Sequence, residues 1–65
     1  MRDYTNSEMK HIIDEHIHSE RDRIILKYCY TDGYTYEKIA ELVGMSSRQI
    51  ATIISKGTLI IEKFL

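Results

Sequence analysis

The sequence lacks proline and tryptophan, and it contains one cysteine, Cys29, and three glycines. A single cysteine excludes an internal disulfide framework and a multi-cysteine zinc site. No apolar run approaches the roughly 20 residues that a helix needs to cross a bilayer. The N-terminus also lacks the apolar core of a signal peptide, so we expect a cytoplasmic protein without membrane contact. Because linkers and repeats are absent as well, the sequence predicts a single domain over residues 1–65.

An excess of positive charge is also absent. Nine Lys and Arg residues face ten Asp and Glu residues, which gives a net charge of −1 and disfavours a purely electrostatic nucleic-acid binder. A chain of 65 residues closes one small core and rarely houses an enzyme cleft. No nucleophile triad or pair of carboxylates is recognisable, so we expect no catalytic residue, no cofactor and no enzyme activity. A binding module is the expected class.

The residues that are present predict an all-α domain of four helices, because apolar positions recur with a helical period. Hydroxyl side chains mark the expected helix starts. The first helix is predicted to begin near Ser7, and the second to run from Glu20 to about Thr31 behind Ser19, with Asp22 as its capping-box partner. The third is predicted over 36–43 behind Thr35. The fourth is predicted to begin behind Ser46, with Gln49 as capping-box partner, and to continue to the C-terminus.

The apolar positions also predict which faces are buried. The second helix is apolar over most of its circumference, so it is expected to be central and packed from several sides. Tyr28, Tyr30 and Tyr36 are expected in the core, and Tyr34 is expected at the surface. On the fourth helix one apolar face is predicted, which is formed by Ile50, Ile53, Ile54, Gly57, Ile61 and Phe64.

Residues 35–56 form the most informative stretch, because they predict a helix-turn-helix. The first helix of this pair is short and ends at Gly44, where a turn needs positive φ. Ala40 is small enough for a second helix to cross closely over the first. Ser46 then begins the second helix, whose exposed first turns could enter a major groove. Five apolar side chains are spaced to fill the wedge between the two helices: Ile39, Val43, Met45, Ile50 and Ile53.

These residues resemble region four of bacterial sigma factors. The resemblance runs without a gap from residue 20 to about residue 61. It includes Glu20-Arg21-Asp22-Arg23, Ile25-Leu26, Tyr30, Gly33, Thr35-Tyr36-Glu37-Lys38-Ile39-Ala40, Gly44, Ser46 and Ile50. DNA-binding domains of the LuxR/GerE type share much of the pattern, so the resemblance specifies the architecture better than the subfamily. No segment resembles the sigma region that melts the promoter, so we do not expect a free-standing sigma factor.

The resemblance implies a sequence-specific, double-stranded DNA-binding transcription regulator of bacterial or phage origin. Residues 47–56 correspond to a recognition helix that lies in the major groove. Arginine can pair with guanine and glutamine with adenine, while serine and threonine suit phosphates or bases. The residues expected to contact DNA are Thr35, Tyr36, Ser46, Ser47, Arg48, Gln49, Thr52, Ser55 and Lys56.

A second reading is a sigma-like protein-interaction module that engages RNA polymerase, an anti-sigma factor or another protein. The low positive charge and the apolar C-terminus favour this reading. A homodimer seam or partner surface is expected at Leu59, Ile60, Phe64 and Leu65. The histidines His11, His16 and His18 are poorly spaced for one ion, so no metal site is expected, and His16 is read as a partly buried structural residue. Cys29 is read as a small hydrophobic residue.

Overall fold

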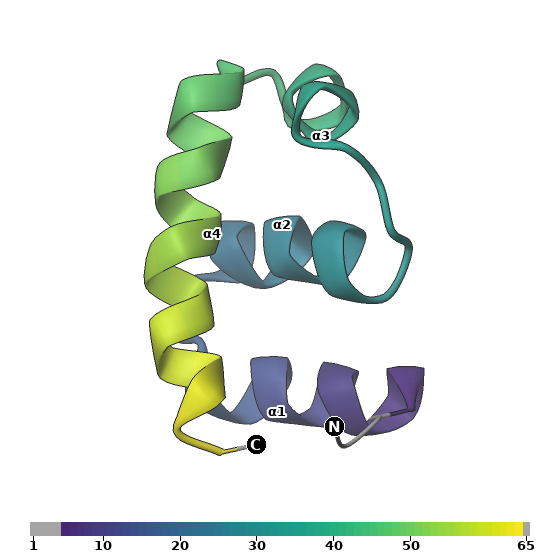
Figure 1. Cartoon of the computed structure of the whole chain (residues 1–65), viewed down its shortest axis with the longest axis vertical. Helices are drawn as coiled ribbons and strands as arrows, with labels where there is room; N and C mark the ends of the chain where they lie inside the picture. Colours follow the sequence, from purple (N-terminus) through teal and green to yellow (C-terminus); the bar gives the residue numbers. More distant parts are fainter. Residues whose placement is uncertain (1–4, 65) are drawn as a thin grey trace.

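The computed structural model describes residues 5–64. These residues form four helices, α1 (Asn6–His16), α2 (Glu20–Tyr30), α3 (Tyr36–Val43) and α4 (Ser47–Glu62), and they contain no strand. Figure 1 shows α1, α2 and α3 arranged along one side of the long helix α4. The predicted all-α, four-helix architecture is confirmed. Within the described range, no helix combines the length and apolar character needed to span a membrane.

Each helix begins behind a hydroxyl side chain that accepts a hydrogen bond from the backbone amide three residues on. The prediction of Ser7 as the first cap is wrong. Thr5 caps α1, and the Glu8 carboxylate accepts from the Thr5 amide at 3.2 Å to complete a capping box. Ser19 caps α2 as predicted, but the Asp22 carboxylate accepts from Arg21 Nε at 3.2 Å instead of closing a box.

The turn between α3 and α4 depends on Gly44. This residue has φ of 72°, in the left-handed region that glycine adopts at little cost. The amides of Gly44 and Met45 both donate to the carbonyl of Ala40, at 2.9 and 3.0 Å. This carbonyl group in the last turn of α3 is therefore hydrogen-bonded within the turn. The positive φ predicted at Gly44 is therefore confirmed.

The core is aliphatic and receives side chains from all four helices. As predicted, α2 is packed from several sides, because it contacts α1, α3 and α4; α4 likewise contacts the other three helices. Ile39 and Ile50 are fully buried, while Val43, Met45 and Ile53 pack around them as the predicted wedge. The buried apolar residues are Ile13, Ile17, Ile25, Leu26, Ile39, Ala40, Ile50, Ile54 and Ile61.

Two apolar side chains, those of Tyr36 and Ile24, are more exposed than the sequence predicts. Tyr36 was expected in the core, but it is 40% exposed because it is the first residue of α3, and α3 is anchored instead by Ile39 and Ala40 one turn later. Ile24 is 43% exposed, so the buried arc of α2 is narrower than its apolar sequence suggested. Tyr34 lies at the surface, as predicted, with its ring against that of Tyr28.

Polar contacts join neighbouring helices at the edge of the core. Lys27 Nζ on α2 lies 2.6 Å from Asp14 Oδ1 on α1, and this hydrogen bond lowers the pKa of the Asp14 carboxyl. The hydroxyls of Tyr30 and Thr58 hydrogen-bond to each other between α2 and α4. Cys29 packs against the core, and burial raises the pKa of its thiol, which fits its reading as a small hydrophobic residue.

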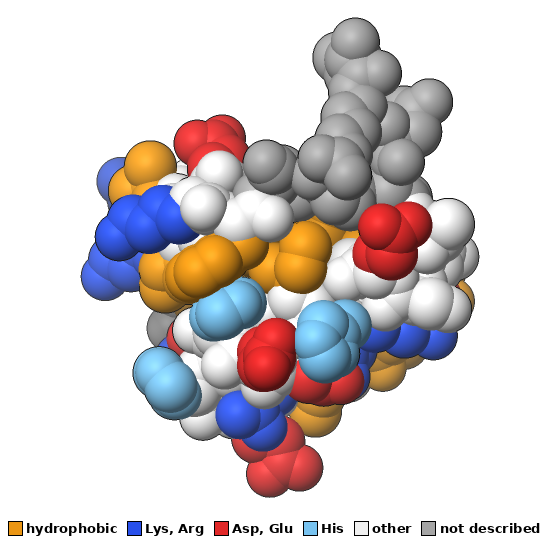
Figure 2. All heavy atoms as spheres, turned by 90° about the horizontal axis from the view of Figure 1, so that it is seen from below, with side chains coloured by type: hydrophobic (Ala, Val, Ile, Leu, Met, Phe, Trp, Pro, Cys, Tyr) orange, Lys and Arg blue, Asp and Glu red, His pale blue; other side chains and the backbone are white. Residues whose placement is uncertain are grey.

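The end of α4 differs from the prediction. The helix ends at Glu62, so Phe64 does not lie on its apolar face. Instead the Phe64 ring stacks on His16, with centroids 3.4 Å apart and an interplanar angle of 4°. His16 is half-buried, as expected of a structural residue. Figure 2 shows the surface on the side of α1, where the histidines lie among side chains of both charges.

Gly57 sets the distance between α2 and α4. A Cβ added at this position would lie 2.6 and 2.7 Å from the two terminal methyl groups of Leu26 and 3.1 Å from its Cγ. Leu26 is fully buried, so its side chain has little room to move away. The two helices therefore approach as closely as they do because residue 57 has no side chain.

We expect Gly57→Ala to lower the free energy of unfolding by up to about 2 kcal/mol. Overpacking a core costs about 1–3 kcal/mol, and the higher helix propensity of alanine offsets about 1 kcal/mol of this cost. Urea unfolding followed by circular dichroism measures the change. Because the clash involves Leu26, the penalty should shrink when Gly57→Ala is made in a Leu26→Ala background. An equal penalty in both backgrounds would contradict this explanation.

Candidate nucleic-acid interface

The outward face of α4 follows from its buried face. Ile50, Ile54, Gly57 and Ile61 are buried at spacings of four, three and four residues, which defines one side of the helix. Arg48, Thr52 and Ser55 lie on the opposite side and are exposed, with Lys56 beside them. An arginine, two hydroxyl side chains and a lysine thus form a continuous polar surface over about two turns.

All nine residues predicted to contact DNA are exposed. Seven of them belong to the cap and the first three turns of α4, so the fold brings them together on one helix. Thr35 and Tyr36 lie at the start of α3, where the Thr35 hydroxyl accepts a hydrogen bond from the Lys38 amide at 3.2 Å. Because α3 packs directly against α4, these two residues belong to the same helix-turn-helix unit.

The start of α4 is fixed by a reciprocal capping box. The Ser46 hydroxyl accepts from the Gln49 amide at 3.2 Å, and the Gln49 carboxamide oxygen accepts from the Ser46 amide at 3.1 Å. The Ser46 hydroxyl also lies 3.2 Å from the same oxygen and donates to it. The predicted capping box is confirmed. Gln49 is therefore a structural residue of the helix start as well as an exposed side chain.

The Thr52 hydroxyl is also engaged within the helix. It donates its proton to the carbonyl of Arg48 at 3.1 Å, so only its lone pairs face outward. Thr52 consequently offers an acceptor to a ligand. Arg48, in contrast, makes no side-chain hydrogen bond or ion pair within residues 5–64, so all of its donors are available.

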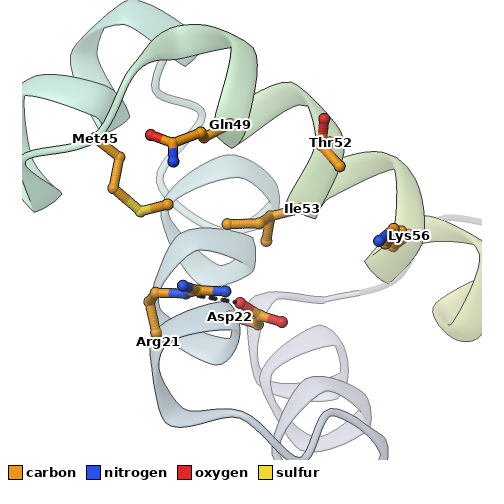
Figure 3. Close-up of a pocket in the computed structure, with 7 residues that line it drawn as sticks. All are labelled: Arg21, Asp22, Met45, Gln49, Thr52, Ile53 and Lys56. Atoms are coloured by element: carbon orange, nitrogen blue, oxygen red, sulfur yellow. Dashed lines mark hydrogen bonds and ion pairs between the residues drawn. The ribbon is translucent and has the colours of Figure 1, made fainter.

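A groove of about 330 Å³ runs along the flank of α4, between α4 and the start of α2. Figure 3 shows Gln49, Thr52 and Lys56 on the α4 side of this groove, with Arg21 and Asp22 on the α2 side. Met45 and Ile53 form its apolar floor. Arg21 is not among the residues that the sequence predicts at the site. Only the run of charged residues at the start of α2 draws attention to Arg21 in the sequence. This run does not reveal that the start of α2 lies beside the middle of α4.

The predicted partner surface lies beyond these residues on α4. Leu59 is 65% exposed, Ile60 37% and Phe64 46%, whereas Leu65 lies outside the described residues. Leu59 continues the outward side of α4, seven residues after Thr52. Leu42 on α3, which is not part of the predicted partner surface, is 47% exposed. The exposed leucines thus lie on two different helices.

The described residues do not bring together three histidine, cysteine or carboxylate side chains in a way that could hold a metal ion. His11 pairs with Glu15 at 3.0 Å along the exposed side of α1. This contact is a surface interaction between residues one helical turn apart, of the kind that contributes little to stability.

A short helix, a turn through glycine and a capped second helix with a polar outward face define the helix-turn-helix class of DNA-binding domains. Within this class the chain belongs to the family described as Sigma-70, region 4, whose sequence profile matches residues 19–58. The resemblance identified from the sequence is therefore confirmed. No curated protein and no solved structure gave a significant match.

Membership of this family points to a DNA-binding, sigma-like role in transcription. Domains of the family bind DNA and RNA polymerase, and they are binding modules without enzyme activity. The matched residues include α2, α3, the turn at Gly44 and most of α4. The matched range therefore includes the whole helix-turn-helix and the groove residues on α2.

We expect Ser46→Ala to lower the free energy of unfolding by about 1 kcal/mol, because the variant loses the N-cap of α4. Thermal unfolding followed by circular dichroism measures the loss. Ser55→Ala is a matched control, since Ser55 is exposed on the same helix and caps nothing. It should leave stability unchanged or slightly raised. Equal stability of the two variants would contradict the assigned role of the cap.

Proposed function

We propose that this protein is a sequence-specific, double-stranded DNA-binding transcription regulator of bacterial or phage origin. In this proposal residues 47–56 of α4 lie in the major groove, and Arg48 and Thr52 contact base edges together with Ser47. Thr35, Tyr36, Ser55 and Lys56 contact phosphates on either side, while Ser46 caps the helix. The domain over residues 1–65 acts as one binding unit and needs no cofactor.

One observation carries the proposal most directly. The capped first turns of α4 present Arg48, Thr52 and Ser55 together, on the side opposite Ile50 and Ile54. A helix presented in this way fits a major groove about 12 Å wide. Arg48 is suited to guanine because a free guanidinium can donate to O6 and N7 together.

The distribution of charge supports the same orientation. Residues 46–65 contain three basic residues and one acidic residue, whereas the rest of the chain is net negative. A surface with so few basic residues makes few phosphate contacts, so we expect one copy to bind DNA weakly at physiological salt. Binding to RNA polymerase or to a second copy would raise the affinity through a shared tether.

We expect Arg48→Ala to lose about 1–3 kcal/mol of discrimination at one base pair, the range for a bidentate arginine–guanine contact. Fluorescence anisotropy with random-sequence duplex across a salt series first establishes binding. Selection from a random library then supplies the specific site and the preference at each base pair. The variant should retain the helical circular dichroism spectrum, because Arg48 is exposed.

Lys10→Ala is the matched control, since it removes one positive charge from α1, where Lys10 lines a pocket with residues of α2 and none of α4. It should keep the base preferences of the wild-type protein. If Arg48→Ala also keeps them, Arg48 does not read a base. If the wild-type protein fails to bind duplex even at low salt, the proposal of DNA binding is wrong.

A second function is supported by the apolar surface formed by Leu59, Ile60 and Phe64. We propose that this surface contacts protein, either RNA polymerase or a second copy of the chain. Leu59 and Ile60 lie on the last turns of α4 and Phe64 lies just beyond its end, so the first turns remain free. Protein contact and DNA contact are therefore compatible on one helix.

We expect Leu59→Lys to weaken the protein complex at least tenfold without loss of stability, because a 65% exposed side chain contributes little to the core. Sedimentation of the chain alone measures self-association, and sedimentation with purified bacterial RNA polymerase core measures the second complex. Leu42→Lys, on α3, is the control and should bind as the wild-type protein does. A wild-type protein that remains monomeric and does not bind the polymerase would exclude this function.

A further inference from the structure

We propose that Gln49 contacts a phosphate of the DNA backbone through its amide N–H groups, and that it does not read a base. This inference rests on the DNA-binding function proposed above and assigns a ligand to the groove between α2 and α4. It departs from the general expectation that glutamine on a recognition helix pairs with adenine. Three features of the structure support it.

The first feature is the fixed oxygen of Gln49. Its Oε1 accepts from the Ser46 amide at 3.1 Å and from the Ser46 hydroxyl at 3.2 Å. Because the backbone amide can only donate, the oxygen and not the nitrogen must occupy this position. Pairing with adenine requires both the oxygen and the nitrogen of glutamine. Gln49 could make that pair only by giving up the capping box that starts α4.

The second feature is the direction of the free nitrogen. Figure 3 shows the oxygen of Gln49 turned toward the start of α4 and the amide nitrogen turned into the groove. Within residues 5–64 no acceptor is within hydrogen-bond distance of this nitrogen. The side chain therefore presents two N–H donors to whatever enters the groove.

The third feature is the charge around the groove. Arg21 and Lys56 supply two cations, one from each wall. The Asp22 carboxylate also lines the groove, but it already accepts from Arg21 Nε at 3.2 Å. Two cations, an amide donor and one paired carboxylate suit an oxygen that carries negative charge. On duplex DNA these oxygens belong to the phosphates that flank the major groove.

As a consequence, some residues of α4 contact the DNA backbone and others contact the bases. Gln49 faces the flank of the helix with Lys56, so both fix the position of the helix against a backbone strand. Sequence discrimination is then left to Arg48 and Thr52 on the outward side of α4 and to Ser47 at its start. We therefore expect the base preferences of the domain to be unchanged when the Gln49 side chain is removed.

The test compares Gln49→Ala with Ser46→Ala on the selected duplex and on the same duplex with each base pair changed in turn. Both variants weaken the cap, but Ser46→Ala keeps the Gln49 amide. We expect Gln49→Ala to bind every duplex about three- to tenfold more weakly than Ser46→Ala does, the value of one hydrogen bond. Its ratios of affinity between base pairs should equal those of the wild-type protein.

A methylphosphonate scan identifies the phosphate. Replacing one backbone phosphate at a time with a neutral methylphosphonate should reveal a position where the wild-type protein and Ser46→Ala lose affinity and Gln49→Ala loses markedly less. Circular dichroism and unfolding of each variant, measured in parallel, allow every affinity to be corrected for the folded fraction.

Two results would overturn the inference while leaving DNA binding intact. One is a changed preference of Gln49→Ala at a single base pair, which would show that Gln49 reads a base. The other is an identical methylphosphonate profile for Gln49→Ala and the wild-type protein, which would limit Gln49 to its role in the cap. A wild-type protein that does not bind random duplex at low salt overturns the proposed function, and this inference with it.

Discussion

The close approach of α2 and α4 at Gly57 is the constraint on which the rest of the structure depends. Because residue 57 carries only a hydrogen atom, the terminal methyl groups of Leu26 pack close to the backbone of α4. In this way α2 covers one side of the core. This contact determines which side of α4 is buried. Through the helical period it also determines that Arg48, Thr52 and Ser55 face away from the protein. The packing of the buried side of α4 thus determines which residues form the exposed recognition surface, namely Arg48, Thr52 and Ser55.

Most of the fold could be predicted from the sequence, because hydroxyl caps, glycine turns and apolar periodicity are local signals. Gly44 shows this well, since its position after a short helix requires the left-handed φ of 72° that the structure has. The first helix shows how a local signal can mislead. Thr5 and Ser7 are both capable caps, and only the position of Glu8, three residues after Thr5, decides between them. Tyr36 was misplaced because periodicity ignores how deeply the end of a short helix is buried.

The sequence predicts which residues form the candidate site. It does not predict which of their hydrogen-bond donors and acceptors remain available to a ligand. Exposure of the predicted residues on α4 follows from the amphipathic pattern of that helix. The pattern does not reveal that Gln49 has already used its oxygen and Thr52 its proton within the helix. It also cannot show that Arg21, at the start of α2, lies across a groove from Lys56. Internal hydrogen bonds and contacts between distant segments arise only when the helices are packed.

The stack of Phe64 on His16 joins the end of the described chain to α1. Ser46, at the other end of α4, is about 24 Å away along the helix axis, from 16 residues at about 1.5 Å each. A fluorophore, affinity tag or surface linker attached through the C-terminal segment would therefore sit far from the first turns of α4. The same separation means that immobilising the protein by this end leaves the recognition surface accessible to a duplex in solution.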